Sequence, residues 1–456
     1  MAFLDENYLI ANAPGKRIFE TVKSLPVVDP HNHADVREIA ENNCYSDAWR
    51  LFAATDHYVW EMLRKRDVPE EFITGKRTPE EKFLAMAKVF PEIAGNPVYE
   101  WIHLDLKRYF GIDELLSERT GKTIWNAVNA KLAADAFRPQ ALLTGPLNVE
   151  VMSSTDDPVD LLEDHGRVNA AVGRRLVRPT WRPDKAMKIA APGWREYIGK
   201  LAARFEMRIA SFGDLIEAMR RSHDYFAEHG CLASDHGLEI PVGCDASWEE
   251  ADAAFVKALE GTPLSRGEEA CFMGMFLGEA AALDSGKDWV MQLHMGAVRD
   301  VRRSLFDALG PDVGGDVSNH YQDLLPGLLS LLNRFDGKLK TVLYCLDAGH
   351  QATLATTARA FGSKVRLGSA WWLNDTPVGM KRQLELISSI DIFSNFAGMV
   401  SDSRKLLSYG SRFEMFRRVL SDVLGGLVVR GQMPEEAALA SARRMAYEGT
   451  KSFWNL

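Results

Sequence analysis

The sequence has few cysteines and no long apolar run, and each shortage excludes a class of protein. The cysteines are scattered, odd in number and without CxxC spacing, so neither a disulfide framework nor a cysteine zinc site is expected. There are five of them in 456 residues: Cys44, Cys231, Cys244, Cys271 and Cys345. Apolar runs such as GLLSLL fall far short of the roughly 18 residues that suggest a membrane span. We therefore expect no membrane segment and a location in the reducing cytoplasm.

An excess of positive charge is also missing. Lys and Arg number 54 against 63 Asp and Glu, so 54 − 63 gives a formal net charge of −9. A nucleic-acid or anionic-membrane surface needs clustered cations, so neither partner is expected. The first residues, MAFLDENYLIANAPGKR, carry acidic side chains where a secretory signal has a basic and then an apolar region. With 46% hydrophobic and 26% charged residues, the composition is that of a folded globular protein.

Short apolar segments that end in polar or turn residues recur eight times, with helical patterns such as 195–207, 212–230 and 267–286 between them. They read as continuous apolar runs, which is typical of parallel strands buried on both faces. Strand followed by helix, eight times, predicts an α/β fold of the distorted (β/α)8 TIM-barrel type. The predicted strand segments are 25–33, 148–158, 174–184, 231–237, 289–296, 341–350, 365–375 and 396–404.

The gap between the first two strand segments, residues 34–146, is too long for a simple strand-to-helix connection. It is filled with aromatic-rich helical patterns at 46–66, 78–90 and 96–111. No Gly/Ser-rich linker separates it from the rest of the chain. The sequence therefore predicts a single barrel domain over 1–456 with a helical insertion at 34–146.

The sharpest local feature is the pair His31 and His33, directly after the first apolar segment. In an extended backbone, residues two apart point to the same side, so both imidazoles can reach one metal ion. Asp29 lies on the same face and is expected to orient a ring nitrogen by a hydrogen bond. The alternative is a surface turn with two exposed histidines.

A metal site in a barrel needs a further ligand from across the mouth. Asp402 ends the eighth strand segment, which neighbours the first when a barrel closes, and a carboxylate offsets the charge of the ion. Its alternative role is the N-cap of the helix that follows. His294, at the end of the fifth strand segment, is expected at the same mouth, as a metal ligand, as a donor to substrate or as a buried packing residue.

The chain at this point resembles uronate isomerase, the glucuronate isomerase family of the amidohydrolase superfamily. The resemblance runs nearly end to end, and one departure is LDAGHQAT after the sixth strand, where the family has an Asn-Pro segment. The stretches that carry it are DPHNH at 29–33, DHYVWEMLR at 56–64, GNPVYEWIHLDLKRYFGI at 95–112, TDDP at 155–158, RPDKA at 182–186, ASDHG at 233–237, MQLHMGAVR at 291–299, WWLND at 371–375 and SDSR at 401–404.

The resemblance implies interconversion of D-glucuronate with D-fructuronate and of D-galacturonate with D-tagaturonate on a barrel with one divalent metal ion, zinc being favoured. It implies His31, His33 and Asp402 as the metal ligands. By the same mapping, Asp402, Tyr58, Arg404 and His294 take catalytic positions, and His57, Arg182 and Asp235 take substrate-binding positions.

Chemistry makes these roles plausible. Aldose–ketose isomerisation moves a proton from C2 to C1 through a cis-enediol, and a tyrosine can carry it if its pKa is lowered. We expect Arg404 beside Tyr58 for this purpose, Asp402 as carrier of the ring-opening proton, and Arg182 as the clamp for the substrate carboxylate. Without the resemblance, pairing of Arg182 with Asp184, packing of Tyr58 and solvation of Arg404 would be preferred.

Two other functions remain open: a metal-dependent lactone or amide hydrolase of the same superfamily, and a non-catalytic sugar-acid binding protein. The preferred C4 epimer is not readable, and two histidines with a carboxylate also suit manganese, iron or cobalt. A homo-oligomer is expected. Of the remaining histidines, His103 is expected to be structural, and His165, His223 and His229 to be solvated.

Overall fold

The computed structural model describes residues 3–456, and the strands that it contains are mostly parallel. The predicted α/β fold with parallel strands is confirmed. One sheet has the order β1-β2-β3, a second has β4-β5-β8-β9, and an antiparallel pair, β6-β7, was not predicted. The strands are β1 Val27–Asp29, β2 Val149–Ser153, β3 Val177–Arg178, β4 Ala233–Leu238, β5 Val290–Met295, β6 Ala297–Val298, β7 Val317–Ser318, β8 Lys340–Cys345 and β9 Val365–Leu367.

Isolated β-bridges connect the two parallel sheets, so that the strands follow one another in the order expected for a barrel. Trp181, just beyond β3, bridges to Ser234 of β4, and Leu367 of β9 bridges to Phe396. The chain after Phe396 then returns to β1, because the Asp402 amide donates to the His31 carbonyl at 3.2 Å. The eighth predicted strand segment thus lies in its expected place beside the first, but it does not form a β-strand. Positive φ angles at Gly398 and Asp402, +112° and +47°, interrupt its extended backbone.

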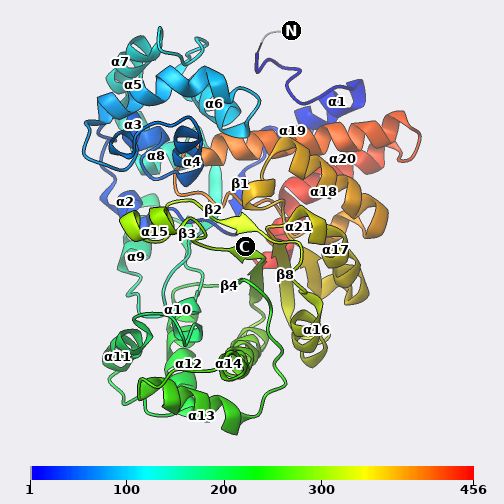
Figure 1. Cartoon of the computed structure of the whole chain (residues 1–456). Helices are drawn as coiled ribbons and strands as arrows, with labels where there is room; N and C mark the ends of the chain where they lie inside the picture. Colours follow the sequence, from blue (N-terminus) through cyan, green and yellow to red (C-terminus); the bar gives the residue numbers. More distant parts are fainter. Residues whose placement is uncertain (1–2) are drawn as a thin grey trace.

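In the view of Figure 1, helices lie above, below and to both sides of the central strands. In Figure 1, α3–α8 gather at one end of the molecule and α11–α14 at the other. Their bounds are α1 Ala13–Val22, α2 Val36–Glu41, α3 Ala48–Phe52, α4 His57–Lys65, α5 Pro79–Val89, α6 Pro97–Phe110, α7 Gly121–Leu132, α8 Pro139–Thr144, α9 Glu163–Val172, α10 Asp184–Met187, α11 Trp194–Arg204, α12 Phe212–Glu228, α13 Trp248–Leu259, α14 Arg266–Gly286, α15 Arg303–Leu309, α16 Leu325–Arg334, α17 Gln351–Ala360, α18 Pro377–Ile390, α19 Ser408–Val429, α20 Glu435–Arg443 and α21 Gly449–Trp454.

The stretch between β1 and β2 contains seven α-helices, α2–α8, and no strand among its described residues, all of 34–146. Local signals set their ends. Thr78 and Glu81 form a reciprocal capping box at the start of α5. Asn96 caps α6, which begins with a proline and ends at Gly111 in the left-handed conformation. α6 packs against α19, which brings this helical stretch against the last part of the chain.

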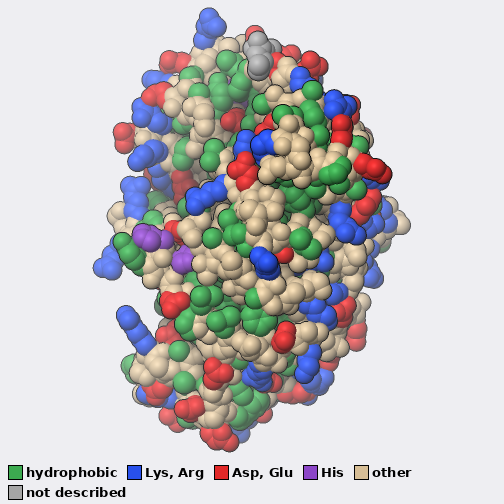
Figure 2. Space-filling view, turned by 90° about the vertical axis from the view of Figure 1, so that its right-hand side faces the viewer, with side chains coloured by type: hydrophobic (Ala, Val, Ile, Leu, Met, Phe, Trp, Pro, Cys, Tyr) green, Lys and Arg blue, Asp and Glu red, His purple; other side chains and the backbone are tan. Residues whose placement is uncertain are grey.

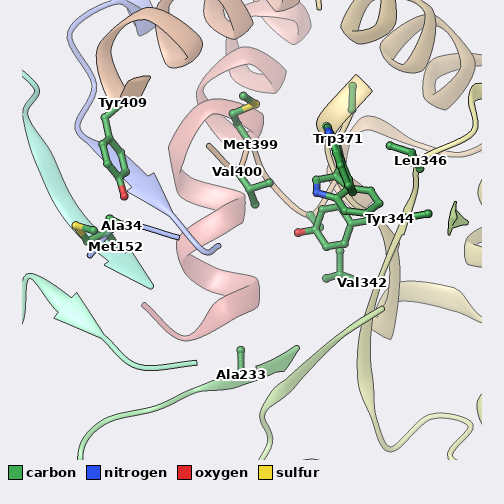
Figure 3. Close-up of a cluster of buried hydrophobic side chains, with 14 of the residues drawn as sticks. Ala34, Met152, Ala233, Val342, Tyr344, Leu346, Trp371, Met399, Val400 and Tyr409 are labelled. Carbon is green, nitrogen blue, oxygen red and sulfur yellow. The ribbon is translucent and has the colours of Figure 1, made fainter. Parts of the chain in front are cut away.

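The interior of the strand ring is filled by side chains from several strands. Figure 3 shows Val342 and Tyr344 of β8 beside Trp371, and Ala233 of β4 and Met399 elsewhere in the same buried cluster. All five are buried. On the face shown in Figure 2, acidic and basic side chains are interspersed. In the described part of the chain, no helix combines the length and the apolar character that crossing a membrane requires.

Candidate functional site

His31, His33 and Asp402 converge at one end of the strand ring. The Nε2 atoms of His31 and His33 lie 3.3 and 3.2 Å from the same carboxylate oxygen, Oδ1 of Asp402. The His31 side chain is fully buried, and Asn32 fixes it in place because its amide groups donate to the Ser153 carbonyl of β2. Two imidazoles and one carboxylate within reach of one point form a donor set that suits a divalent cation.

The backbone around Asp402 is held by β1. The Ser401 amide and hydroxyl donate to the Asp29 carboxylate at 2.9 and 2.6 Å, and the His33 amide donates to the Ser403 carbonyl. The sequence had predicted that Asp29 orients an imidazole. In the structure it instead anchors the segment around Ser401. The N-cap alternative for Asp402 is also wrong, because α19 begins only at Ser408 with Leu407 at its N-cap.

The charge on Asp402 is stabilised from three directions. Burial raises the pKa of Asp402, but hydrogen bonds with His31 and His33 outweigh burial and hold it well below its usual range. Its second oxygen, Oδ2, accepts a hydrogen bond of 2.8 Å from the Trp371 indole. Burial lowers the pKa of His33, which keeps that imidazole in the neutral form that a metal ion requires.

Asp235 lies at the centre of a second buried group. It is fully buried on β4, and its oxygens lie 2.7 Å from Nδ1 of His294 and 3.0 Å from Nη1 of Arg182. Burial raises its pKa, but Arg182 and the neighbouring histidines hold it well below its usual range. Nδ1 of His31 is 3.9 Å away. Asp235 thus links two imidazoles and one guanidinium at the mouth of the ring.

His294 is a neutral imidazole with a fixed orientation. Burial lowers its pKa to about 4, despite the nearby Asp235. Its Nδ1–H therefore donates to Asp235, which leaves Nε2 unprotonated, buried and without a hydrogen-bond partner among residues 3–456. The ring stacks on Tyr344, its register neighbour on β8, at 4.3 Å and an interplanar angle of 3°. A group bound in the mouth could use this free nitrogen.

A cavity of about 390 Å³ opens over these groups. Seven of the nine predicted site residues line it: His31, His33, His57, Arg182, His294, Asp402 and Arg404. The other two, Tyr58 and Asp235, are buried and contact lining residues. Four other cavities, of 1060, 1030, 430 and 400 Å³, are larger, but none of the nine residues lines them. The side chains predicted from the sequence are thus concentrated at one cavity that is not selected by its size.

Arg182 makes the pairing with Asp184 that the sequence offered as an alternative, and it also lines the cavity. Its Nε lies 3.3 Å from Asp184 and its Nη1 lies 3.0 Å from Asp235, so it is paired inside the protein. It also lines the cavity, and about a fifth of its side chain is exposed there, 21%. The guanidinium has five N–H donors, so two ion pairs leave donors for a bound anion.

His57 and Tyr58 are the first two residues of helix α4, which lies outside the strand ring. Asp56 caps the helix by accepting from the Tyr58 amide at 3.0 Å, and its carboxylate pairs with Lys405 at the same distance. The His57 ring stacks on Tyr58 at 4.6 Å. Of these two residues, only His57 reaches the cavity wall, and the buried Tyr58 hydroxyl has no hydrogen-bond partner in the described part of the chain.

The expected pairing of Tyr58 with Arg404 is wrong in this structure. Arg404 lines the cavity, but its guanidinium lies 3.7 Å from Asp312. The cation over the Tyr58 ring is Arg412 of α19, with its guanidinium carbon 4.8 Å from the ring centre. Burial raises the pKa of Tyr58 well above its ordinary value, and Arg412 opposes that shift only in part. The unexpected neighbour arises because α19 packs against α6 and not because of a local sequence motif.

Sequence reasoning also missed part of the cavity wall. Arg299 lies over the Trp372 ring at 4.9 Å and pairs with Asp316 at 3.5 Å, and Lys185 and Lys188 line the same cavity. Arg299 falls within the stretch MQLHMGAVR, so its position in the resemblance was a usable signal. Together with Arg182 and Arg404, these side chains place five cations on the cavity wall, alongside the carboxylates of Asp184, Asp312 and Asp316.

Comparison with known proteins agrees with this geometry. The family model described as glucuronate isomerase matches residues 1–454. A uronate isomerase from Thermotoga maritima is 46% identical over 452 residues, 99% of each chain, and its crystal structure superposes with a TM-score of 0.98 over 100% of both chains. A uronate isomerase from Geobacillus thermodenitrificans is 36% identical over 100% of this chain and 99% of its own.

A more distant solved structure has the same architecture. The glucuronate isomerase from Caulobacter crescentus is 26% identical, covers 99% of this chain and 97% of its own, and has a TM-score of 0.94. The resemblance found in the sequence is therefore confirmed over the full chain. The chain belongs to the glucuronate isomerase family of aldose–ketose isomerases.

Proposed function

We propose that this protein interconverts D-glucuronate with D-fructuronate and D-galacturonate with D-tagaturonate. The observation that carries the proposal is the cavity itself, where His31, His33 and Asp402 converge beneath a wall of cationic side chains. A hexuronate carries one carboxylate, which such a wall attracts, and a row of hydroxyl groups, which the neighbouring polar groups can bind. The names of the relatives support the same substrate class.

The His31, His33 and Asp402 cluster fits a divalent metal ion, and we propose zinc. Both imidazoles direct Nε2 at the carboxylate oxygen, and nitrogen and oxygen donors of this kind bind zinc. A metal held there would supply Lewis-acid polarisation of a substrate oxygen. Asp235 would orient the His31 ring through Nδ1, as carboxylates commonly orient metal-binding imidazoles.

The chain's own side chains would then bind the sugar and move its protons. Arg182 holds the substrate carboxylate, with His57 beside it on the cavity wall. Asp402 carries the proton during ring opening. Tyr58 takes the proton from C2 and delivers it to C1. In that step the C2–H bond breaks, a C1–H bond forms, and the hydroxyl proton passes from O2 to O1 through a cis-enediol. The free Nε2 of His294 accepts a hydrogen bond from a substrate hydroxyl.

The hydrolase alternative uses fewer of these residues. A metal-dependent lactone or amide hydrolase needs the His31, His33 and Asp402 cluster but has no use for a carboxylate clamp or a buried tyrosine. A binding protein needs the clamp but no acid–base group beside the metal site. The isomerase accounts for all three features, and the family to which the chain belongs favours it.

Proton NMR in deuterated water tests the proposal. The purified protein, loaded with zinc, is incubated with D-glucuronate and separately with D-galacturonate. We expect ketouronate to form and solvent deuterium to appear at C1 or C2, and the two rates give the epimer preference. Absence of conversion of both sugars, with metal content verified, would overturn the isomerase proposal in favour of the hydrolase.

Metal identity is tested on the same preparation. We expect a chelator to abolish turnover, and zinc to restore it more fully than manganese, iron or cobalt at equal occupancy. Greater activity with another ion would overturn the assignment to zinc. The expected homo-oligomer and the cytoplasmic location stay predictions, to be checked by light scattering on the purified protein and by cell fractionation.

A further inference from the structure

A buried arginine lies over the ring of Tyr58 and is not part of the cavity wall. Arg412 comes from α19 and is 1% exposed. Its guanidinium carbon is 4.3 Å from the centre of the Trp101 ring and 4.8 Å from that of Tyr58, so the cation contacts two aromatic rings. Asp375 pairs with its Nη1 at 3.0 Å and is itself 2% exposed.

A second contact leads from the same guanidinium to the metal-site segment. Nη1 of Arg412 donates to the carbonyl of Ser401, the residue before Asp402. Arg412 therefore contacts the ring of one predicted proton carrier directly and the carbonyl of the residue that precedes the other. Figure 3 shows Tyr409, one turn earlier on the same helix, pointing toward the interior of the ring beside Ala34 and Met152.

Stability alone is a weak reason for this charge. Removing a guanidinium and a carboxylate from water costs several kcal/mol per ion, and apolar residues of similar volume often replace a buried ion pair without loss. An apolar side chain between Trp101 and Tyr58 would fill the same space. It would not supply positive charge to the face of the tyrosine ring, where a cation is attracted to the ring and more so as the ring gains negative charge.

We propose that Arg412 is a positioning residue that holds the Tyr58 ring at the reaction site and stabilises the negative charge that Tyr58 gains while it carries the proton. This rests on the role of Tyr58 in the proposed isomerisation. Arg404, the cation that the sequence suggested for this purpose, is paired with Asp312 at the cavity wall. Asp375 and Trp101 keep Arg412 in place.

A double-mutant cycle tests whether Arg412 acts through Tyr58. Arg412→Lys keeps the charge but loses the planar stacking on the two rings. We expect kcat to fall by about 100-fold, within the range for a general acid–base group, with KM changed less than about twofold. In the Tyr58→Phe background the same substitution should change kcat by less than about twofold, because its target is absent. Equal losses in both backgrounds would overturn the proposal.

Arg417→Lys is the matched control. Arg417 lies on the same helix and is also buried, and its bonds to the described residues go to the carbonyls of Lys23 and Pro26, neither of which lines the cavity. We expect it to leave kcat and KM near those of the natural chain. A loss as large as that of Arg412→Lys would mean that any change of arginine in α19 is disruptive, and would overturn the specific role.

A measurement independent of turnover separates this inference from the proposed function. With ¹³C-labelled tyrosine rings, the Tyr58 signal is identified by its loss in Tyr58→Phe. We expect Arg412→Lys to shift that signal and Arg417→Lys to leave it in place. If Arg412→Lys does not fold, Asp375→Asn, which frees the guanidinium, should shift the same signal. An unmoved signal overturns the positioning role, whereas a natural chain that converts no hexuronate overturns the proposed function.

Discussion

At the scale of single residues, Asp402 combines an uncommon backbone with several side-chain contacts. Its φ of +47° lies in the left-handed region, which costs an ordinary residue about 1–2 kcal/mol. Strain of this kind persists where the surroundings fix the conformation, and here β1 fixes it through Asp29 and the His31 carbonyl. The result is a carboxylate aimed at two imidazoles and the Trp371 indole.

Asp402→Asn should reduce turnover far more than substrate binding. Asparagine tolerates the left-handed conformation, so the backbone is kept while the proton carrier and one anionic ligand are lost. We expect kcat to fall by at least about 1000-fold, from the combined loss of acid–base and metal function, with the substrate dissociation constant changed less than about tenfold. Stopped-flow binding and steady-state kinetics measure the two effects. Near-normal turnover would contradict the role of Asp402.

Arg182→Met should raise the KM for both uronates by more than about tenfold, because charged hydrogen bonds to the substrate carboxylate are worth roughly 1.5–3 kcal/mol. Metal content, measured by atomic emission, should stay unchanged. Lys185→Met is the comparison, since Lys185 is 69% exposed and pairs with Asp157, and a much smaller effect is expected. Loss of metal in Arg182→Met would instead make Arg182 a structural support of the metal site.

Much of the cavity wall was predictable from single residues. The buried side chains that contact those residues were not. The pair His31 and His33 and the aspartate Asp402 follow from strand ends, because parallel strands bring their ends to one mouth. Arg412 could not be found this way, since nothing in the sequence of α19 indicates which ring it will face. His165 and His223 were predicted to be solvated and are buried, and inside the protein Nε2 of His165 bonds to the Ser154 hydroxyl and Nε2 of His223 to the Asp284 carboxylate.

At the scale of elements, seven of the eight predicted strand segments contain a strand at the expected place. Apolar runs between turn residues locate such strands well. The eighth fails because the backbone at Gly398 and Asp402 leaves the extended region, which no apolar pattern reveals. The pair β6-β7 was missed because each strand has only two residues, and β7 is exposed.

Helix α6 contains a histidine that makes stability depend on pH. His103 donates from Nδ1 to the Tyr99 carbonyl at 2.8 Å and accepts at Nε2 from the Leu116 amide at 2.9 Å. Burial lowers its pKa to about 4, whereas the unfolded chain has a histidine pKa of about 6.5. The neutral form is therefore favoured by folding, and this stability is present above pH 6.5 and lost as the pH falls toward 4.

His103→Gln should flatten this dependence. Between pH 7.5 and pH 5 we expect the free energy of unfolding of the natural chain to decrease by about 2 kcal/mol more than that of the variant. Urea unfolding at the two pH values measures the difference. Parallel pH dependence in the two proteins would contradict the role given to His103.

At the scale of the whole molecule, the first and last parts of the chain pack together. Helices α1 and α19 lie against each other at the two glycines Gly15 and Gly425. A Cβ atom at Gly425 would lie 2.3 Å from the Gly15 nitrogen and 2.1 Å from Oδ1 of Asn12. The two backbones approach closely because neither glycine has a side chain.

Gly425→Ala should therefore destabilise the protein by about 1–3 kcal/mol, the usual cost of overpacking. Gly426→Ala is the matched control, since its Cβ would meet only the flexible end of Arg430 at 3.2 Å. That change should be neutral or stabilising by up to about 1 kcal/mol, because alanine favours helix. Urea unfolding compares the two variants, and equal effects would show that the close approach of α1 and α19 is not required.

The return of the last segment to β1 has a consequence for synthesis on the ribosome. His31 and His33 are made early, but Asp402 and Arg412 are added some 370 residues later. A nascent chain can form β1 through β9 and still lack the carboxylate that completes the cluster and the cation behind Tyr58. Catalysis thus becomes possible only after both of these residues have been added, and a chain that stops before Asp402 is silent even where its earlier part has folded.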